Sequence, residues 1–291
     1  MLKPSEKSPM APAPICNAMT IDVEDYFQVS AFARHIPRES WASISCRVEG
    51  NIDRILALLD EAGVKATFFT LGWIAERYPA MVRHIVANGH ELASHGCAHQ
   101  RVSDLQPAEF LNDITCSKAL LEDIGGQQVL GYRAPSFSIG SQNLWALDLL
   151  ETAGYRYSSS IYPIRHDHYG MPDAPRFAFH PSGKEGLLEL PVTTVRLFKR
   201  NFPAGGGGYF RLWPYPVSRW FLQRVNHHDC RSAIFYFHPW EIDPGQPRQE
   251  GIGMKTRFRH YFNLHRMEGR VKALTRDFLW DRMDRIFLEK V

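Results

Sequence analysis

Over the first 160 residues, the hydrophobic and polar positions follow a strand pattern and a helix pattern in turn. Residues 18–23 form an apolar strand candidate, and in 51–63 apolar side chains from Ile52 to Leu59 recur at the i, i+3, i+4, i+7 spacing of an amphipathic helix. Gly63 stands where such a helix stops. The same signals predict further strands at 64–72, 90–95, 129–135 and 155–160, and further helices at 78–89, 106–126 and 141–154.

Repeated β-α units of about 25 to 35 residues favour a parallel sheet or barrel with helices outside. Residues 165–215 break this rhythm with Pro, Gly and aromatic residues, including PAGGGGYFRLWPYP. We interpret the Gly run as a flexible surface loop. The alternative is a substrate-contacting loop that uses Tyr209, Phe210, Arg211 and Trp213. Further on, 232–241 predicts a buried strand and 270–291 a terminal amphipathic helix.

Length and charge narrow the class of protein. With 291 residues and 44% hydrophobic content, the chain can bury a large core, and we expect one domain over 18–291. The Pro-rich residues 1–17 are expected to be disordered. Lys and Arg number 34 against 31 Asp and Glu, a net charge of +3. This even balance gives no electrostatic reason to expect a nucleic-acid partner.

The cysteines and the apolar runs bear on location. Five scattered cysteines without a CxxC pair indicate reduced thiols, which favours the cytoplasm. The N-terminal stretch lacks an apolar run of signal-peptide length, and no run of about 18 apolar residues occurs elsewhere. We therefore expect a protein without a transmembrane segment, in the cytoplasm or at the inner face of a bacterial membrane.

Polar residues directly after the predicted strands are the candidate functional residues, because function collects at strand ends in parallel α/β folds. They are Asp22, Glu24 and Asp25 after the first strand, His95 and His99 after ELAS, Arg133 after VLGY, and His238 after IFYF.

The pair in SHGCAH has the spacing at which two imidazoles can bind one metal ion. Three residues separate His95 from His99, and Gly96 permits a tight turn between them. A carboxylate from the first strand would complete two nitrogens and one oxygen and leave a fourth position for water. That donor set is typical of a catalytic zinc site rather than a structural one. A surface or core role for these histidines is the alternative.

The order of these motifs resembles the polysaccharide deacetylase family, carbohydrate esterase family 4. TIDVED is similar to its first motif, SHGCAH to the second, RAPSF to the third, and YFH to the last. The stretches DVEDYF, GGGGYFRLWPYP, FHPWEIDP and FRHYFNLHR resemble a subgroup associated with bacterial exopolysaccharide and protein-sorting loci. This resemblance covers most of the chain after about residue 18.

The resemblance implies a distorted (β/α) barrel with fewer than eight strands, loop insertions and a C-terminal helical extension from about residue 241. It also implies metal-dependent hydrolysis of N-acetyl groups from acetamido sugars of an exopolysaccharide or its precursor, with Zn²⁺ as the expected divalent metal. Asp22 would be the general base, His238 the general acid, Arg133 the residue that orients Asp22, and His95 and His99 metal ligands. A backbone N–H near Ser136 would bind the oxyanion, and Trp240 is a further candidate substrate contact. Peripheral association with membrane-bound polysaccharide machinery is compatible with this function.

Two positions depart from the family pattern. The base and the metal-binding acid are usually adjacent, whereas Val23 and Glu24 separate Asp22 from Asp25. Strand alternation turns Asp22 and Glu24 to one side, while a bend at the strand end would bring in Asp25. We prefer Asp25 as the third metal ligand, with Glu24 as the alternative. In addition, Ser158 stands where the family usually has an acid that partners the motif arginine.

Two other functions remain as alternatives. Relatives with similar barrels and altered first motifs resemble hydrolases of small cyclic amides such as ureides and imides. The Ser158 departure and the aromatic residues after the Gly run fit a catalytically weak carbohydrate-binding protein.

Overall fold

The computed structural model describes residues 14–167, 169–183 and 185–289. Of the segment 1–17 that we expected to be disordered, residues 1–13 lie outside the described residues. The first strand begins at Cys16, two residues before its predicted start. The strands are β1 (Cys16–Val23), β2 (Thr67–Thr70), β3 (Glu91–Ser94), β4 (Gly131–Tyr132), β5 (Tyr157–Ser158), β6 (Leu188–Glu189), β7 (Thr194–Leu197), β8 (Arg200–Pro203), β9 (Ile234–Phe237) and β10 (Leu279–Asp281).

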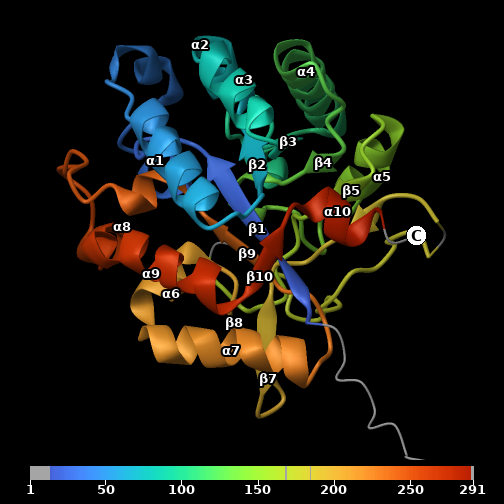
Figure 1. The fold of residues 1–291 in the computed structure, drawn as a ribbon. Coiled ribbons are helices and arrows are strands. Elements are labelled where there is room, and N and C mark those ends of the chain that lie inside the picture. Colours follow the sequence, from blue (N-terminus) through green and yellow to red (C-terminus); the bar gives the residue numbers. More distant parts are fainter. Residues whose placement is uncertain (1–13, 168, 184, 290–291) are drawn as a thin grey trace, which may run out of the picture.

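A curled parallel sheet, in which β1 pairs with strands on both of its sides, forms the core of the fold (Figure 1). It contains eight strands, and β7 and β8 form a separate antiparallel hairpin. Ala18 pairs with both β9 and β10, and Thr20 pairs with both β9 and β2. Strands β10 and β2 therefore lie on the same side of β1, one beyond the other, and the sheet is seven strands wide. This confirms the predicted distorted (β/α) barrel.

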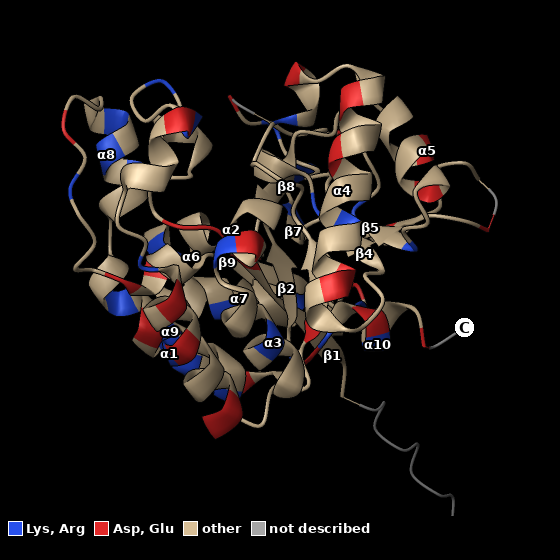
Figure 2. Ribbon diagram, turned by 90° about the horizontal axis from the view of Figure 1, so that it is seen from above, with Lys and Arg blue, Asp and Glu red and all other residues tan. Residues whose placement is uncertain are grey.

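Helices cover the outside of the sheet, with α1 to α5 following the alternation that the sequence predicts (Figure 1). In α1 the apolar face predicted from Ile52 to Leu59 is buried against β1 and β2. Charged side chains of both signs lie on the outer helices, in keeping with the even charge balance (Figure 2). The helices are α1 (Val48–Glu61), α2 (Gly72–Arg77), α3 (Pro79–Ala87), α4 (Pro107–Gly125), α5 (Trp145–Thr152), α6 (Gly207–Leu212), α7 (Tyr215–His227), α8 (Met254–Tyr261), α9 (Leu264–Asp277) and α10 (Met283–Phe287).

The C-terminal segment differs from its prediction as one helix over 270–291. Helix α9 ends at Asp277, and Phe278 is extended. Residues 279–281 then pair with β1 as β10, and the indole of Trp280 packs on Phe235 in the core. Only one residue of β10, Trp280, is buried. So short a strand does not interrupt the helical spacing of apolar residues in the sequence, and the helix prediction therefore extended through 279–281.

Candidate active site

Four parallel strands bring the predicted functional residues together at their carboxyl ends. Asp22 lies in β1 and Glu24 just beyond it, His95 follows β3, Arg133 follows β4, and His238 follows β9. Since parallel strands end at the same edge of a sheet, side chains from distant parts of the sequence meet there.

A carboxylate and two imidazoles form the candidate metal site. One ligand atom from each of Glu24, His95 and His99 lies within 4.8 Å of the others. Glu24 Oε2 is 2.7 Å from His99 Nε2, yet this buried oxygen has no partner in hydrogen-bonding geometry among the described residues. A carboxylate oxygen and an imidazole nitrogen held this close together fit a pair of ligands directed at a common ion.

The protonation states of these groups also fit a cation. His95 Nδ1 lies 2.8 Å from the carbonyl oxygen of Arg133, which can only accept, so Nδ1 carries the proton and Nε2 presents its lone pair. Burial lowers the pKa of His95 to about 4, which keeps the ring neutral. Burial alone would raise the pKa of Glu24, but the charges of His99 and His238 outweigh it and hold the pKa well below its usual range. Glu24 therefore offers an anionic oxygen to a cation, and His95 offers a neutral nitrogen.

Asp25 does not reach this site, which corrects our preference for it as the third ligand. Its Oδ2 accepts hydrogen bonds from the backbone N–H groups of Val48 at 2.9 Å and Arg47 at 2.5 Å, and its Oδ1 accepts one from Tyr26 at 2.8 Å. Asp25 thus satisfies N–H groups at the start of α1, and the chain bend after β1 leaves Glu24 facing the histidines.

Asp22 is held by a buried arginine, as predicted. Arg133 Nη1 donates to Asp22 Oδ1 at 2.6 Å and to Thr20 Oγ1 at 2.8 Å. Nη2 and Nε bond to the hydroxyl and the carbonyl of Ser159, and the guanidinium lies 4.0 Å above the ring of Phe69. Arg133 is fully buried, so these contacts fix the position of the Asp22 carboxylate.

Glu189, on the strand next to β5, compensates for the acid that the family usually has at the position of Ser158. Ser158 pairs in register with Glu189 of β6, and Glu189 Oε1 accepts hydrogen bonds from the N–H groups of Ser160 and Ile161. Burial raises the pKa of Glu189. Glu189 therefore braces the loop that carries Ser159, the partner of Arg133. No sequence pattern indicates this role, because Glu189 lies in the segment with irregular patterning.

His238 is the second candidate for proton transfer, and a carboxylate missed in the sequence positions it. Its Nδ1 lies 2.8 Å from Glu241 Oε1, while Nε2 is 3.4 Å from Glu24 and 3.9 Å from Asp22. Burial would lower the pKa of His238, but the charges of Glu24, Glu241 and Asp22 raise it to about 9. His238 is therefore protonated at neutral pH, as a general acid requires. The i, i+3 spacing in HPWE was the available signal for Glu241.

Most of the candidate substrate contacts are structural instead. Arg211 is buried and bonds to Glu241 and to carbonyl oxygens of 259–262, and Phe210 packs in the main core. Trp213 packs with the hairpin and α7, and Trp240 is stacked between His238 and His260. Arg211 and Trp240 therefore support the site, and Phe210 and Trp213 have packing roles instead. Tyr209 is partly buried beside Phe137, and Ser136 Oγ lies 2.6 Å from Ser30 Oγ, so both stay predictions.

The Gly run forms neither a flexible surface loop nor a substrate-contacting loop, the two alternatives that we predicted for it. Gly205, Gly206 and Gly207 are buried. A Cβ at Gly207 would lie 2.2 Å from Glu241 Oε1, and one at Gly206 would lie 2.8 Å from the ring of Tyr236. The absence of side chains lets this backbone approach the strand and the carboxylate that carry and position His238.

Asp113 of α4 is a further supporting residue that sequence reasoning missed. It accepts a hydrogen bond from the N–H of Cys97 at 3.1 Å. Gly96 has φ +75° and a Cβ there would lie 2.7 Å from Asp113 Oδ2. His99 itself has φ +53°. Asp113 and Gly96 together shape the tight turn that brings both histidines to one point.

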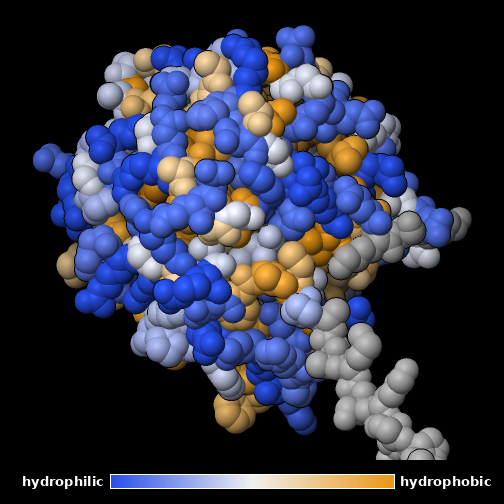
Figure 3. Space-filling view, in the orientation of Figure 1, coloured by the Kyte–Doolittle hydropathy of each residue, from blue (hydrophilic) through white to orange (hydrophobic). Residues whose placement is uncertain are grey.

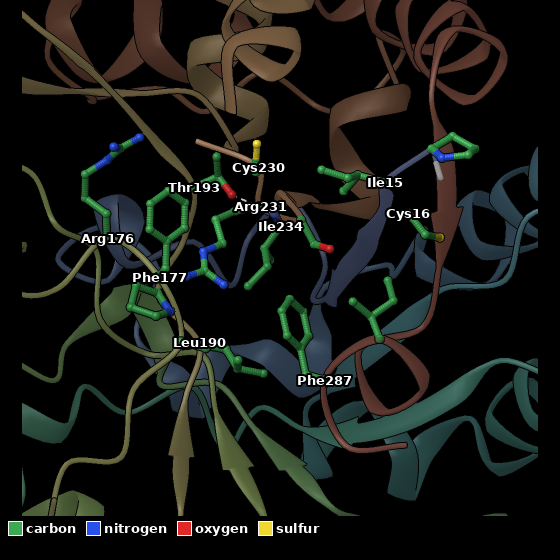
Figure 4. A pocket seen from close by; sticks show the side chains of 15 residues that line it. Ile15, Cys16, Arg176, Phe177, Leu190, Thr193, Cys230, Arg231, Ile234 and Phe287 are labelled. Carbon is green, nitrogen blue, oxygen red and sulfur yellow. Dashed lines mark hydrogen bonds between the residues drawn. The ribbon is translucent and has the colours of Figure 1, made fainter. Parts of the chain in front are cut away.

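A pocket of about 480 Å³ lies at the opposite end of the barrel, near the first residues of β1 and β9 (Figure 4). Its lining includes Cys16, Arg176, Phe177 and Phe287, and contains neither a carboxylate nor a histidine. This pocket therefore lacks the carboxylate and imidazole groups that form the candidate active site. In the described part of the chain, no helix is long and apolar enough to cross a membrane.

Comparison with known proteins gives two family matches that meet after Ser158. Residues 44–158 match the polysaccharide deacetylase family, and residues 159–288 match a domain of unknown function, DUF3473. The second match begins well before residue 241, where we expected a family-specific extension.

Curated relatives match a little over a third of the chain. A peptidoglycan deacetylase-like protein of Gibberella zeae is 31% identical over 112 residues, 38% of this chain and 32% of that protein. A chitooligosaccharide deacetylase of Bradyrhizobium is 32% identical over 100 residues, 34% of this chain and 43% of that protein. The matched segment thus spans less than half of each relative.

Among solved structures, that of a putative polysaccharide deacetylase from Mycobacterium smegmatis has the same fold, with a TM-score of 0.57 and 20% identity over 96% of this chain and 92% of the other. Residues 44–158 therefore form a domain of the polysaccharide deacetylase family, also called carbohydrate esterase family 4, and the solved structure shares the fold of the chain.

Proposed function

We propose that this protein hydrolyses N-acetyl groups from the acetamido sugars of an exopolysaccharide or its precursor, and that the reaction depends on a divalent metal, with zinc as the first candidate. The observation that carries the proposal is the Glu24, His95 and His99 cluster, with Asp22 and His238 beside it. Since β1 pairs with strands from both matched segments, we further propose that residues 18–289 act as one catalytic domain.

The residues suit amide hydrolysis in which a water oxygen bonds to the carbonyl carbon and the C–N bond breaks. A metal bound by Glu24, His95 and His99 would polarise the carbonyl and acidify water. Asp22 accepts the proton of the attacking water while Arg133 fixes its orientation. His238 Nε2 donates a proton to the leaving nitrogen, so that acetate and the free amine are released.

Acetate release from acetamido-sugar oligomers, measured with and without a chelator, tests the proposal. We expect the chelator and His95→Ala each to abolish release, and metal analysis to show that His95→Ala no longer retains the ion. His84→Ala, which removes an exposed imidazole on α3, is the matched control. Chelator-insensitive release, or full activity in His95→Ala, would contradict the mechanism. Turnover of a ureide or imide without acetate release would contradict the substrate class.

A further inference from the structure

The β7–β8 hairpin projects from the barrel at the end opposite the candidate active site. Thr193, just before β7, accepts a hydrogen bond from the N–H of Ile234, the first residue of β9, whereas His238 follows the last residue of β9. Figure 1 shows the hairpin beside α7, away from α1 to α4. Its inner face packs on α7 through contacts of Val195 with Phe221. The hairpin is thus held by α7 and by a hydrogen bond from Asn201 to the carbonyl oxygen of Pro163, while Phe198 and Lys199 are exposed at its tip.

The tip has an unfavourable conformation for the residues that form it. Phe198 and Lys199 connect the two strands, with φ of +49° and +61°. A two-residue turn with both φ values positive normally contains Asn-Gly, because side chains with a bulky Cβ are strained there. Phe198 is also 93% exposed. Neither local conformation nor packing explains a phenylalanine at this position, and retained strain of this kind is common where a residue has a binding role.

The hairpin is also strongly cationic, unlike the chain as a whole. The 38 residues from Pro191 to His228 contain no Asp or Glu. Arg196, Lys199 and Arg200 are exposed around Phe198, and none of them makes an ion pair with another described residue. On α7, Trp220 adds a second exposed aromatic side chain at 47%. Figure 3 shows a hydrophobic spot next to hydrophilic atoms at the projection below α7.

We propose that the hairpin tip docks on an anionic phospholipid membrane surface, with Phe198 inserted among the headgroups and the three cations next to lipid phosphates. An aromatic side chain surrounded by Arg and Lys is the composition of interfacial membrane binding. Because the tip lies at the far end of the barrel from Glu24 and His238, it is not a substrate subsite, and docking leaves the active site open. The proposal does not depend on the proposed hydrolysis.

An acidic protein or a soluble polyanion is the main competing partner. Cations alone would serve to bind either one, and an exposed phenylalanine in a strained turn would add nothing to purely ionic contacts. Insertion into the headgroup region, by contrast, requires an apolar side chain at the most projecting point. The role of Phe198 therefore separates the two kinds of partner.

Vesicle flotation with the full chain tests the docking. We expect binding to an equal mixture of phosphatidylcholine and phosphatidylglycerol, and none to phosphatidylcholine alone. Neutralising Arg196, Lys199 and Arg200 to Gln should weaken binding by roughly fivefold per cation. Phe198→Asn combined with Lys199→Gly should weaken it by about fiftyfold, roughly fivefold from the lost cation and about tenfold from the lost phenylalanine, and raise the thermal midpoint, because Asn-Gly relaxes the turn. Phe258→Ser, at an exposed phenylalanine on α8, is the control.

Three outcomes would overturn the proposal. The first is equal binding to both kinds of vesicle, and the second is unchanged binding by the Asn-Gly variant. The third is competition by a soluble polyanion that is equally effective with and without Phe198. Acetate release from soluble oligomers should be the same in all these variants, so a loss of activity in every protein tested would count against the proposed function and not against docking.

Discussion

At the carboxyl ends of the strands each buried carboxylate of the site faces a cation or an imidazole, whereas at the amino ends Glu91 faces hydroxyl groups and another acid. Glu91 accepts hydrogen bonds from Tyr157 and Thr67, and its neighbour is Asp284. Burial and the charge of Asp284 raise its pKa to about 7, while the pKa values of Glu24 and Glu241 are lowered. The same residue type thus serves as a permanent charge at one end and as a hydrogen-bonding link at the other.

This comparison is tested most strongly at the two adjacent acids after β1. Glu24→Gln removes a charged metal donor, and we expect a loss of roughly 100-fold or more in acetate release together with loss of bound metal. Asp25→Ala removes the acceptor at the start of α1, and we expect a decrease of about 1 kcal/mol in the free energy of unfolding with the metal retained. Metal analysis and urea unfolding of both variants measure this. Metal loss in Asp25→Ala with retention in Glu24→Gln would reverse the assignment.

That pair also shows how far the sequence could go. Strand ends and motif order were sufficient to predict that Asp22, His95, His99, Arg133 and His238 lie together. Choosing between Glu24 and Asp25 required the direction of the bend after Val23. The bend is set by the N–H groups of Arg47 and Val48, which lie more than 20 residues further along the chain. Local pattern contains no information on such a contact.

At the amino end, Glu91 should make stability fall as pH rises. Its folded pKa of about 7 lies above the usual pKa of 4.5 for a glutamate, so its contribution is fully present below pH 4.5 and is lost as pH rises through 7. That gap corresponds to about 3 kcal/mol. Glu91→Gln cannot ionise, so its free energy of unfolding should fall less than that of the parent between pH 5 and 8. Urea unfolding across this range, with Asp53→Asn on the exposed face of α1 as control, measures the difference. Parallel pH curves for Glu91→Gln and the parent would refute it.

The residues that support the site were harder to predict than those that form it. Glu241, Glu189 and Asp113 act through contacts with His238, the Ser159 loop and the histidine turn. Each contact joins the end of one element to another element, or crosses between strands, and depends on the assembled barrel. The Gly run was misinterpreted for the same reason, because a stretch of glycines has the same sequence whether it is exposed or packed under a carboxylate.

Two neighbouring glycines provide the finest test of the paired charges at the carboxyl end. In Gly207→Ala the new Cβ would lie 2.2 Å from Glu241 Oε1, the oxygen that His238 contacts, whereas nothing lies within 4 Å of a Cβ at Gly208. We expect Gly207→Ala to lower kcat with little change in KM and to cost about 1–3 kcal/mol of stability. Gly208→Ala, in the same helix α6, should leave kcat unchanged and add up to about 1 kcal/mol. Steady-state kinetics and urea unfolding of the two variants decide it. If both alanines left kcat intact, Glu241 would not be the residue that positions His238, because its carboxylate could move without consequence.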